Sequence, residues 1–120
     1  MKKTQGNGQF GELISVYTEE QAVKEGVLMH NPSATFEECN MLTANLWEYL
    51  RERCFRMTLT SREDLLEILM GLAKDIYENE RFEGDNDKNF FVIKGNENVK
   101  PVWFARNEQE KLTAMMPEDF

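Results

Sequence analysis

The sequence predicts an α+β fold in which a small, mainly antiparallel sheet packs against three or four helices. Two observations support this prediction: apolar residues recur at helical spacing through the middle of the chain, and short β-branched and aromatic segments lie at both ends. The sheet would consist of an N-terminal strand and a C-terminal three-strand meander. A chain of 120 residues, 41% hydrophobic and 30% charged, is long enough to bury one core. We therefore expect a flexible tail over residues 1–9 and a single domain over residues 10–120.

The first elements are predicted from local patterns between residues 13 and 29. The run "LISVY", at 13–17, is rich in β-branched and aromatic residues and predicts a short strand. Thr18 and Gln21 form a capping-box pattern, in which the hydroxyl accepts from a backbone N–H and the amide side chain reaches back. Gly26 suits the left-handed residue that ends a helix, and the "VLM" that follows is expected to be extended.

A second helical region is predicted over residues 36–54. Thr35 and Glu38 form another capping-box pattern before it. The apolar residues within it recur near the helical period: Phe36, Cys39, Leu42, Leu46, Tyr49 and Leu50. Thr43 could also start a helix, so the region is either one helix or two.

The clearest helix is predicted in "TSREDLLEILMGLAKDIYEN", with Thr60 and Glu63 as its capping residues. Leu69 and Leu72 are expected on its buried face. Further apolar residues flank them, and so wide an apolar face implies burial against a sheet or against two neighbours. Gly71 costs about 1 kcal/mol relative to Ala in mid-helix and is expected to allow close packing.

The C-terminal part of the chain is predicted to be a loop followed by three strands. "ENERFEGDND", at 78–87, is acidic and polar and is typical of a loop. The strand candidates are "NFFVIKG", "PVWFA" and "KLTAMM", and the connections between them are short. An antiparallel meander is therefore the simplest topology for this part.

The charge and the apolar pattern exclude several classes of function. A net charge of −8 argues against a general nucleic-acid binder and against attraction to anionic membranes. No apolar run reaches the roughly 18 residues of a membrane span, and none follows "MKKTQGNGQ" as it would in a signal peptide. We therefore expect a cytoplasmic protein.

The sequence contains no pattern that predicts catalysis or a cofactor. The single histidine, His30, and the two cysteines, Cys39 and Cys54, are too scattered for a structural zinc site. Asp85, Asp87 and Asn89 have the alternating spacing of a calcium loop. That loop requires Gly at its sixth position and Glu at its twelfth, where this chain has Phe90 and Asn96. No catalytic, cofactor-binding or metal-binding residue is predicted.

Three segments resemble a known family: "FGELISVYTEEQAVKEGVLM" at 10–29, "LTANLWEYL" at 42–50 and "KLTAMMPED" at 111–119. They look like those of small bacterial proteins of unknown function that occur on plasmids, integrative elements and phages. Members of this family have a Gly-Pro-Gly-Asp-type turn before the last strand, where this chain has "ARNEQEK". The resemblance implies an accessory protein of a mobile element and implies no reaction.

Two classes of function are consistent with the sequence. The first is a non-enzymatic module that binds a host or element-encoded protein, for example as an acidic decoy whose carboxylates imitate the phosphates of DNA. Its predicted partner-binding residues are Glu83, Asp85 and Asp87 in the acidic loop, together with Trp103. The alternative is a small enzyme with a site built from scattered carboxylates and His30.

Overall fold

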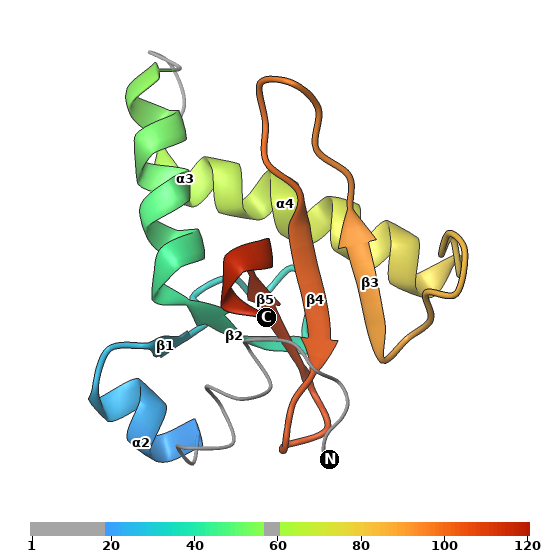
Figure 1. Ribbon diagram of the computed structural model, residues 1–120, viewed down its shortest axis with the longest axis horizontal. Helices are drawn as coiled ribbons and strands as arrows, with labels where there is room; N and C mark the ends of the chain where they lie inside the picture. Colours follow the sequence, from blue (N-terminus) through green and yellow to red (C-terminus); the bar gives the residue numbers. More distant parts are fainter. Residues whose placement is uncertain (1–18, 57–60) are drawn as a thin grey trace.

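The computed structural model describes residues 19–56 and 61–120, in which it has three α-helices, five strands and one short 3-10 helix. In chain order these are α2 (Glu19–Lys24), β1 (Leu28–His30), β2 (Cys39–Thr43), α3 (Ala44–Arg56), α4 (Arg62–Glu78), β3 (Phe90–Ile93), β4 (Val102–Arg106), β5 (Leu112–Met115) and the 3-10 helix η1 (Pro117–Asp119). Figure 1 shows α4 crossing behind β3 and β4, with α3 to one side of the strands. The α+β class is confirmed, whereas the predicted tail at 1–9 and the predicted strand at 13–17 lie outside the described residues.

The strands form one mixed sheet in the order β1-β2-β5-β4-β3. The last three strands make the predicted antiparallel meander, in which Phe104 lies opposite Phe91 on one side and opposite Ala114 on the other. β1 is antiparallel to β2, but β2 and β5 are parallel. The sheet is therefore mixed, and the connection between its two parallel strands contains α3, α4 and the first two strands of the meander.

The prediction of a helix over residues 36–54 is wrong in its first part, because residues 39–43 form β2. Cys39 and Leu42 both pack in the main core. In a regular strand, residues three apart lie on opposite faces, so this arrangement requires an irregularity. The pairing with β5 shifts register between Cys39 and Met41, as in a β-bulge. The bulge adds one residue, so this strand has an apolar spacing that imitates a helical turn.

Helix α3 begins at the alternative start that the sequence offered. The N–H of Leu46 donates to Thr43 Oγ1 at 3.2 Å, which is the bond of an N-cap. Thr35 and Glu38, the predicted capping pair, lie in the connection between β1 and β2 instead. The buried side chains of α3, Leu46 and Leu50, join the main core.

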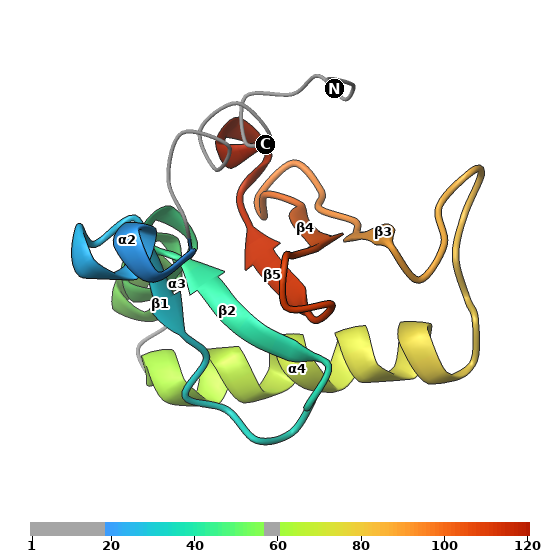
Figure 2. The ribbon, with the colours of Figure 1, turned by 90° about the horizontal axis from the view of Figure 1, so that it is seen from below.

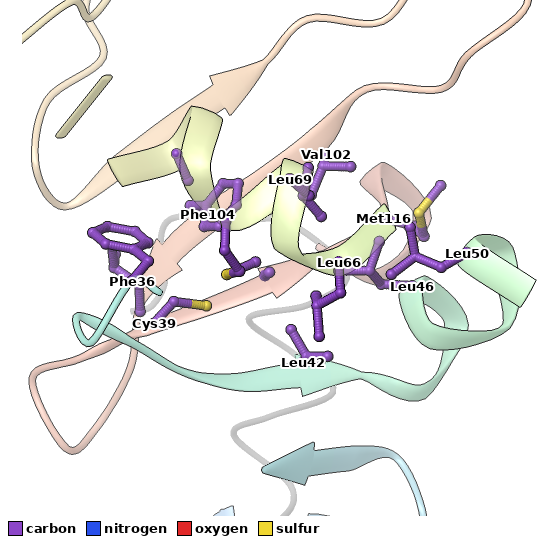
Figure 3. Packing of buried hydrophobic residues seen from close by; sticks show 14 of the residues in the cluster. Phe36, Cys39, Leu42, Leu46, Leu50, Leu66, Leu69, Val102, Phe104 and Met116 are labelled. Carbon is purple, nitrogen blue, oxygen red and sulfur yellow. The ribbon is translucent and has the colours of Figure 1, made fainter. Parts of the chain in front are cut away.

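Helix α4 covers one face of the sheet, and η1 lies on the opposite side (Figure 2). The buried residues of α4 are Leu66, Leu69, Met70 and Ala73. Figure 3 shows Leu66 and Leu69 directed towards side chains of the sheet and of α3. Within this core the rings of Phe91 and Phe104 are stacked, with their centroids 4.9 Å apart.

Two predictions about α4 are corrected. Its N-cap is Ser61, whose Oγ accepts from the N–H of Asp64 at 3.1 Å, whereas Thr60 lies outside the described residues. Leu69 is buried as predicted, but Leu72 is 50% exposed. The buried face is rotated away from Leu72, because the sheet and α3 together cover less than the full apolar width of this helix.

The C-terminal residues are attached to the start of α3 by one buried carboxylate. Asp119 is only 7% exposed. Its Oδ2 accepts from Thr43 Oγ1 at 2.7 Å and from the N–H of Met116 at 3.1 Å, and its Oδ1 accepts from Asn45 Nδ2 at 2.6 Å. Because Thr43 also caps α3, this cluster joins β2, α3 and η1.

We expect Gly26→Val to lower the free energy of unfolding by about 1–2 kcal/mol, the cost of a left-handed residue with a side chain. Gly26 ends α2 with φ +80° and has no heavy atom near the position of a Cβ, so the cost is conformational rather than steric. Urea denaturation measures it, with the exposed Lys24→Val as the matched control. Equal midpoints for the two variants would contradict the prediction.

Candidate protein interface

The negative charge of the protein is concentrated on α4 and on the loop after it. Residues 62–87 contain nine acidic and three basic residues, so they carry −6 of the net charge of −8. All nine acids are exposed, and we call the eight that precede Asp87 the acidic surface: Glu63, Asp64, Glu67, Asp75, Glu78, Glu80, Glu83 and Asp85. The five on α4 recur at spacings of one, three, eight and three residues, which places them on the side of the helix away from the core.

The end of α4 sets the direction of the acidic loop. Glu80 adopts the left-handed conformation, with φ 52°. The N–H of Arg81 then reaches back to the carbonyl of Ile76 at 2.9 Å, which is the closing bond of a Schellman motif. Glu80 therefore occupies a position that usually holds glycine, and its side chain remains exposed next to Glu78.

The three loop carboxylates predicted to bind a partner have different roles. Glu83 lies 2.7 Å from Lys94 Nζ in an exposed ion pair, a type that contributes little to stability. Asp85 is exposed and has no polar partner among the described residues. Asp87 Oδ1 accepts from the N–H groups of Asn89 at 2.7 Å and of Phe90 at 3.3 Å, so Asp87 caps a turn.

This turn explains the calcium-like spacing of Asp85, Asp87 and Asn89. Asn89 Oδ1 accepts from Arg106 Nε at 3.2 Å, while Asp87 bonds to the backbone of its own turn. Across residues 19–56 and 61–120, no three His, Cys, Asp or Glu side chains come together as a metal site would require.

Trp103 lies on the face of the sheet opposite α4. Val102 and Phe104, its neighbours in β4, belong to the main core, as the alternation of a strand predicts. Trp103 packs edge-on against Phe90 and Phe120, with ring centroids 5.4 Å away in both cases. It is half-buried in this aromatic group, which lies next to the acidic loop because Phe90 exchanges backbone hydrogen bonds with Asp87.

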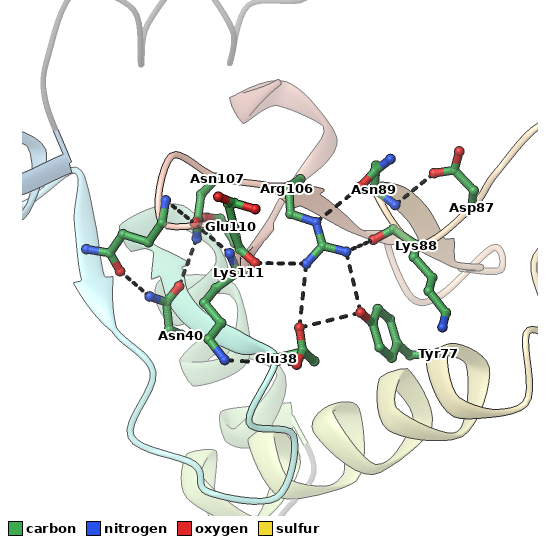
Figure 4. A network of polar contacts seen from close by, with 12 residues as sticks. Glu38, Asn40, Tyr77, Asp87, Lys88, Asn89, Arg106, Asn107, Glu110 and Lys111 are labelled. Atoms are coloured by element: carbon green, nitrogen blue, oxygen red, sulfur yellow. Dashed lines mark hydrogen bonds and ion pairs between the residues drawn. The ribbon is translucent and has the colours of Figure 1, made fainter.

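A second polar cluster surrounds Arg106 at the end of β4 (Figure 4). Its guanidinium donates to four oxygens at 2.6–3.4 Å and forms an ion pair at 3.5 Å: Asn89 Oδ1, the Glu110 carbonyl, the Lys88 carbonyl, the Tyr77 hydroxyl and Glu38. A guanidinium has five N–H donors, and four of them are hydrogen-bonded here while its charge is paired with Glu38. Arg106 therefore joins the loops around β4.

The same view shows how "ARNEQEK" makes its turn. Asn107 Oδ1 accepts from the N–H groups of Gln109 and Lys111 at 3.0 and 3.1 Å. Its Nδ2 donates to Asn40 Oδ1 and Thr113 Oγ1. Glu110 takes the left-handed conformation with φ 59°, which usually favours glycine or asparagine, and the Asn107 side chain caps the turn.

The enzyme alternative would bring His30 together with buried carboxylates, and the described residues show no such contact for the buried Asp119. His30 is an exposed residue of the edge strand β1. Asp119, the buried carboxylate among the described residues, bonds to Thr43, Asn45 and Met116 rather than to His30. Burial raises the pKa of the Cys39 thiol to about 12, so this cysteine stays protonated and unreactive at neutral pH.

Two apolar residues of α4 are exposed, although the apolar pattern of the helix predicts burial. Ile68 is 57% exposed and Leu72 is 50% exposed. The signal for them in the sequence is the wide apolar face of this helix, which by itself indicates burial throughout. A face wider than its neighbours can cover leaves an apolar margin exposed, and here that margin borders the acidic surface.

Comparison of the chain with models of protein families, with curated proteins and with solved structures finds no match. Among the described helices, none combines the length and the apolar character needed to cross a membrane.

Proposed function

We propose that this protein is a non-enzymatic interaction module that binds a basic surface of another protein through the acidic surface of α4 and its loop. The observation that carries the proposal is the charge distribution, in which residues 62–87 hold −6 of the total −8. A rigid helix packed on a sheet presents these carboxylates, and the loop after it extends them.

Half of the acids of the acidic surface have no contact that a partner would have to replace. Glu63, Glu78, Glu80 and Asp85 are exposed and have no ion pair or hydrogen bond through their side chains among the described residues. Complementary charge accelerates encounter and selects partners, and both effects weaken as salt screens exposed charges over a Debye length of roughly 8 Å.

The resemblance to proteins of plasmids, integrative elements and phages suggests the context of this activity. An accessory protein of a mobile element would act on a protein of the host or of the element itself. Carboxylates spaced along a helix and a loop can imitate the phosphates of DNA, so the target would be a DNA-binding surface that the acidic surface occupies as a decoy.

Neutralising three unpartnered acids should slow association with a partner by about tenfold at low salt, because steering depends on the local field. The variant is Glu78→Gln, Glu80→Gln and Asp85→Asn, which avoids the turn-capping Asp87. The partner is first isolated by affinity capture with the wild-type chain and identified by mass spectrometry. Its association rate is then measured by biolayer interferometry at two salt concentrations.

The matched control changes the net charge equally at exposed acids outside the acidic surface: Glu20→Gln, Glu37→Gln and Glu97→Gln. If the control slows association as much as the test variant does, total charge matters and the acidic surface does not. Duplex DNA provides a further arm. A decoy target must release the protein when DNA is added, and a partner that binds DNA and this protein together would contradict the decoy form of the proposal.

A further inference from the structure

We propose that the outer apolar stripe of α4 is a docking site for an amphipathic helix whose apolar face is flanked by lysine or arginine residues. The stripe consists of Leu65, Ile68, Leu72 and Ile76. This inference rests on the proposed function and deepens it, because it specifies where on α4 a partner is anchored and what chemistry the partner presents.

The stripe has the geometry of a helix–helix contact. Its members follow one another at spacings of three and four residues, so their side chains line one side of the helix over about 16 Å. Leu65 and Ile76 are half-buried against the core, whereas Ile68 and Leu72 project outward, 57% and 50% exposed. An exposed row of this spacing is how a helix receives the apolar face of another.

Gly71 gives independent support because the fold has no need of it. A Cβ at this position would meet no heavy atom within 4 Å, and the residue is exposed, so glycine does not provide the close packing inside the domain that the sequence suggested. It nevertheless weakens the middle of α4 relative to alanine. Gly71 lies one turn after Ile68, at the edge of the stripe, where the missing side chain lets the backbone of a docked helix come close.

The charge beside the stripe determines the chemistry of the occupant. Asp64 precedes Ile68 by one turn, and Asp75 follows Leu72 by one turn, so each borders an exposed apolar residue. Glu67 lies one turn before Gly71. Lys74, one turn after Gly71, is the single basic residue of α4 next to this glycine. An apolar row with carboxylates along its border complements an apolar row with cations along its own border.

The same charges oppose a second copy of this chain as the occupant. An antiparallel crossing of two α4 helices about Gly71 would place Glu67 of one copy opposite Asp75 of the other, and Asp64 opposite Glu78. A parallel crossing would place each acid opposite itself. Like charges at facing positions destabilise a contact, so the border selects a basic partner over self-association.

The test uses a synthetic leucine–lysine peptide of about four helical turns, with leucines at helical spacing on one face. A second peptide has the same composition in scrambled order. We expect fluorescence anisotropy to show that the amphipathic peptide binds at least about tenfold more tightly than the scrambled peptide. The double variant Ile68→Ser, Leu72→Ser should bind the amphipathic peptide at least about tenfold more weakly than the wild type, as expected for loss of central anchors. Gly71→Ala should also weaken binding, although it favours the helix.

The charge variant of the acidic surface separates this inference from the proposed function. If the double serine variant binds the amphipathic peptide as the wild type does, while the charge variant binds it less well, the stripe is not the anchor and the acidic surface still is. If the scrambled peptide binds equally well, the stripe has no docking role. Sedimentation velocity must show a monomer at micromolar concentration, and a dimer abolished by the serine substitutions would assign the stripe to self-association instead.

Discussion

Leu66→Ala should lower the free energy of unfolding by about 3–5 kcal/mol, whereas Leu72→Ala on the same helix should lower it by about 1 kcal/mol or less. Leu66 is 1% exposed and packs between the sheet and α3, so its removal loses apolar burial and leaves a cavity. Leu72 is 50% exposed, so its truncation loses part of one contact and leaves no cavity.

Urea denaturation of the two variants and the wild type measures this difference, provided that the slope of the free energy with urea is unchanged. The two substitutions remove the same atoms from the same helix, so differences in helix propensity cancel. Similar losses at both positions would place Leu72 in the core and remove the exposed margin on which the docking site depends. A small loss at Leu66 would mean that the buried face of α4 is assigned wrongly.

The α4 helix shows how far the sequence could predict this fold. The helical period, the Gly26 stop and the three strands of the meander follow from local rules, because each depends on neighbouring residues alone. Which part of a wide apolar face is buried depends on the width of the sheet and the position of α3. The apolar pattern therefore predicts both Leu69 and Leu72 to be buried, whereas Leu69 lies in the core and Leu72 at its exposed margin.

The prediction of a helix where β2 lies is wrong for a different reason. A bulge between Cys39 and Met41 shifts the alternation, so Cys39 and Leu42 share a face at a spacing typical of a helix. No local pattern indicates that this segment will lie between β1 and β5, and the pairing overrides the helical signal.

The sequence indicates some features of the candidate interface but not others. The acidic loop is evident from composition, and Asp85 within it is exposed. Composition cannot reveal that Asp87 caps a turn, because this depends on the direction of its side chain towards Asn89 and Phe90. Nor could it reveal that the acids of α4 lie beside an exposed apolar stripe, since that requires knowing which side of the helix is buried.

Asp119→Ala should lower the free energy of unfolding by about 3 kcal/mol, since each hydrogen bond to a charged group is worth roughly 1.5–3 kcal/mol and the bonds within one cluster do not add fully. The substitution leaves three donors without their acceptor: the Thr43 hydroxyl, Asn45 Nδ2 and the N–H of Met116. The hydroxyl of Thr43 and the N–H of Met116 lie in buried residues, where solvent does not replace the carboxylate.

Two further variants show whether the carboxylate itself is responsible. Asp119→Asn keeps one acceptor oxygen for Thr43 and Met116, and rotation of the Asn45 amide can supply an acceptor to the new NH₂ group, so the loss should be about half as large. Glu118→Ala removes an adjacent exposed carboxylate that lies 3.8 Å from Lys100, and it should change the stability by less than about 1 kcal/mol. If Asp119→Ala is no worse than Glu118→Ala in urea denaturation, the cluster does not hold η1 against the start of α3. If all three variants are equally unstable, the C-terminal residues contribute through packing alone. The hydrogen bonds of Thr43 to Leu46 and to Asp119 would then have no energetic role in joining η1 to the start of α3.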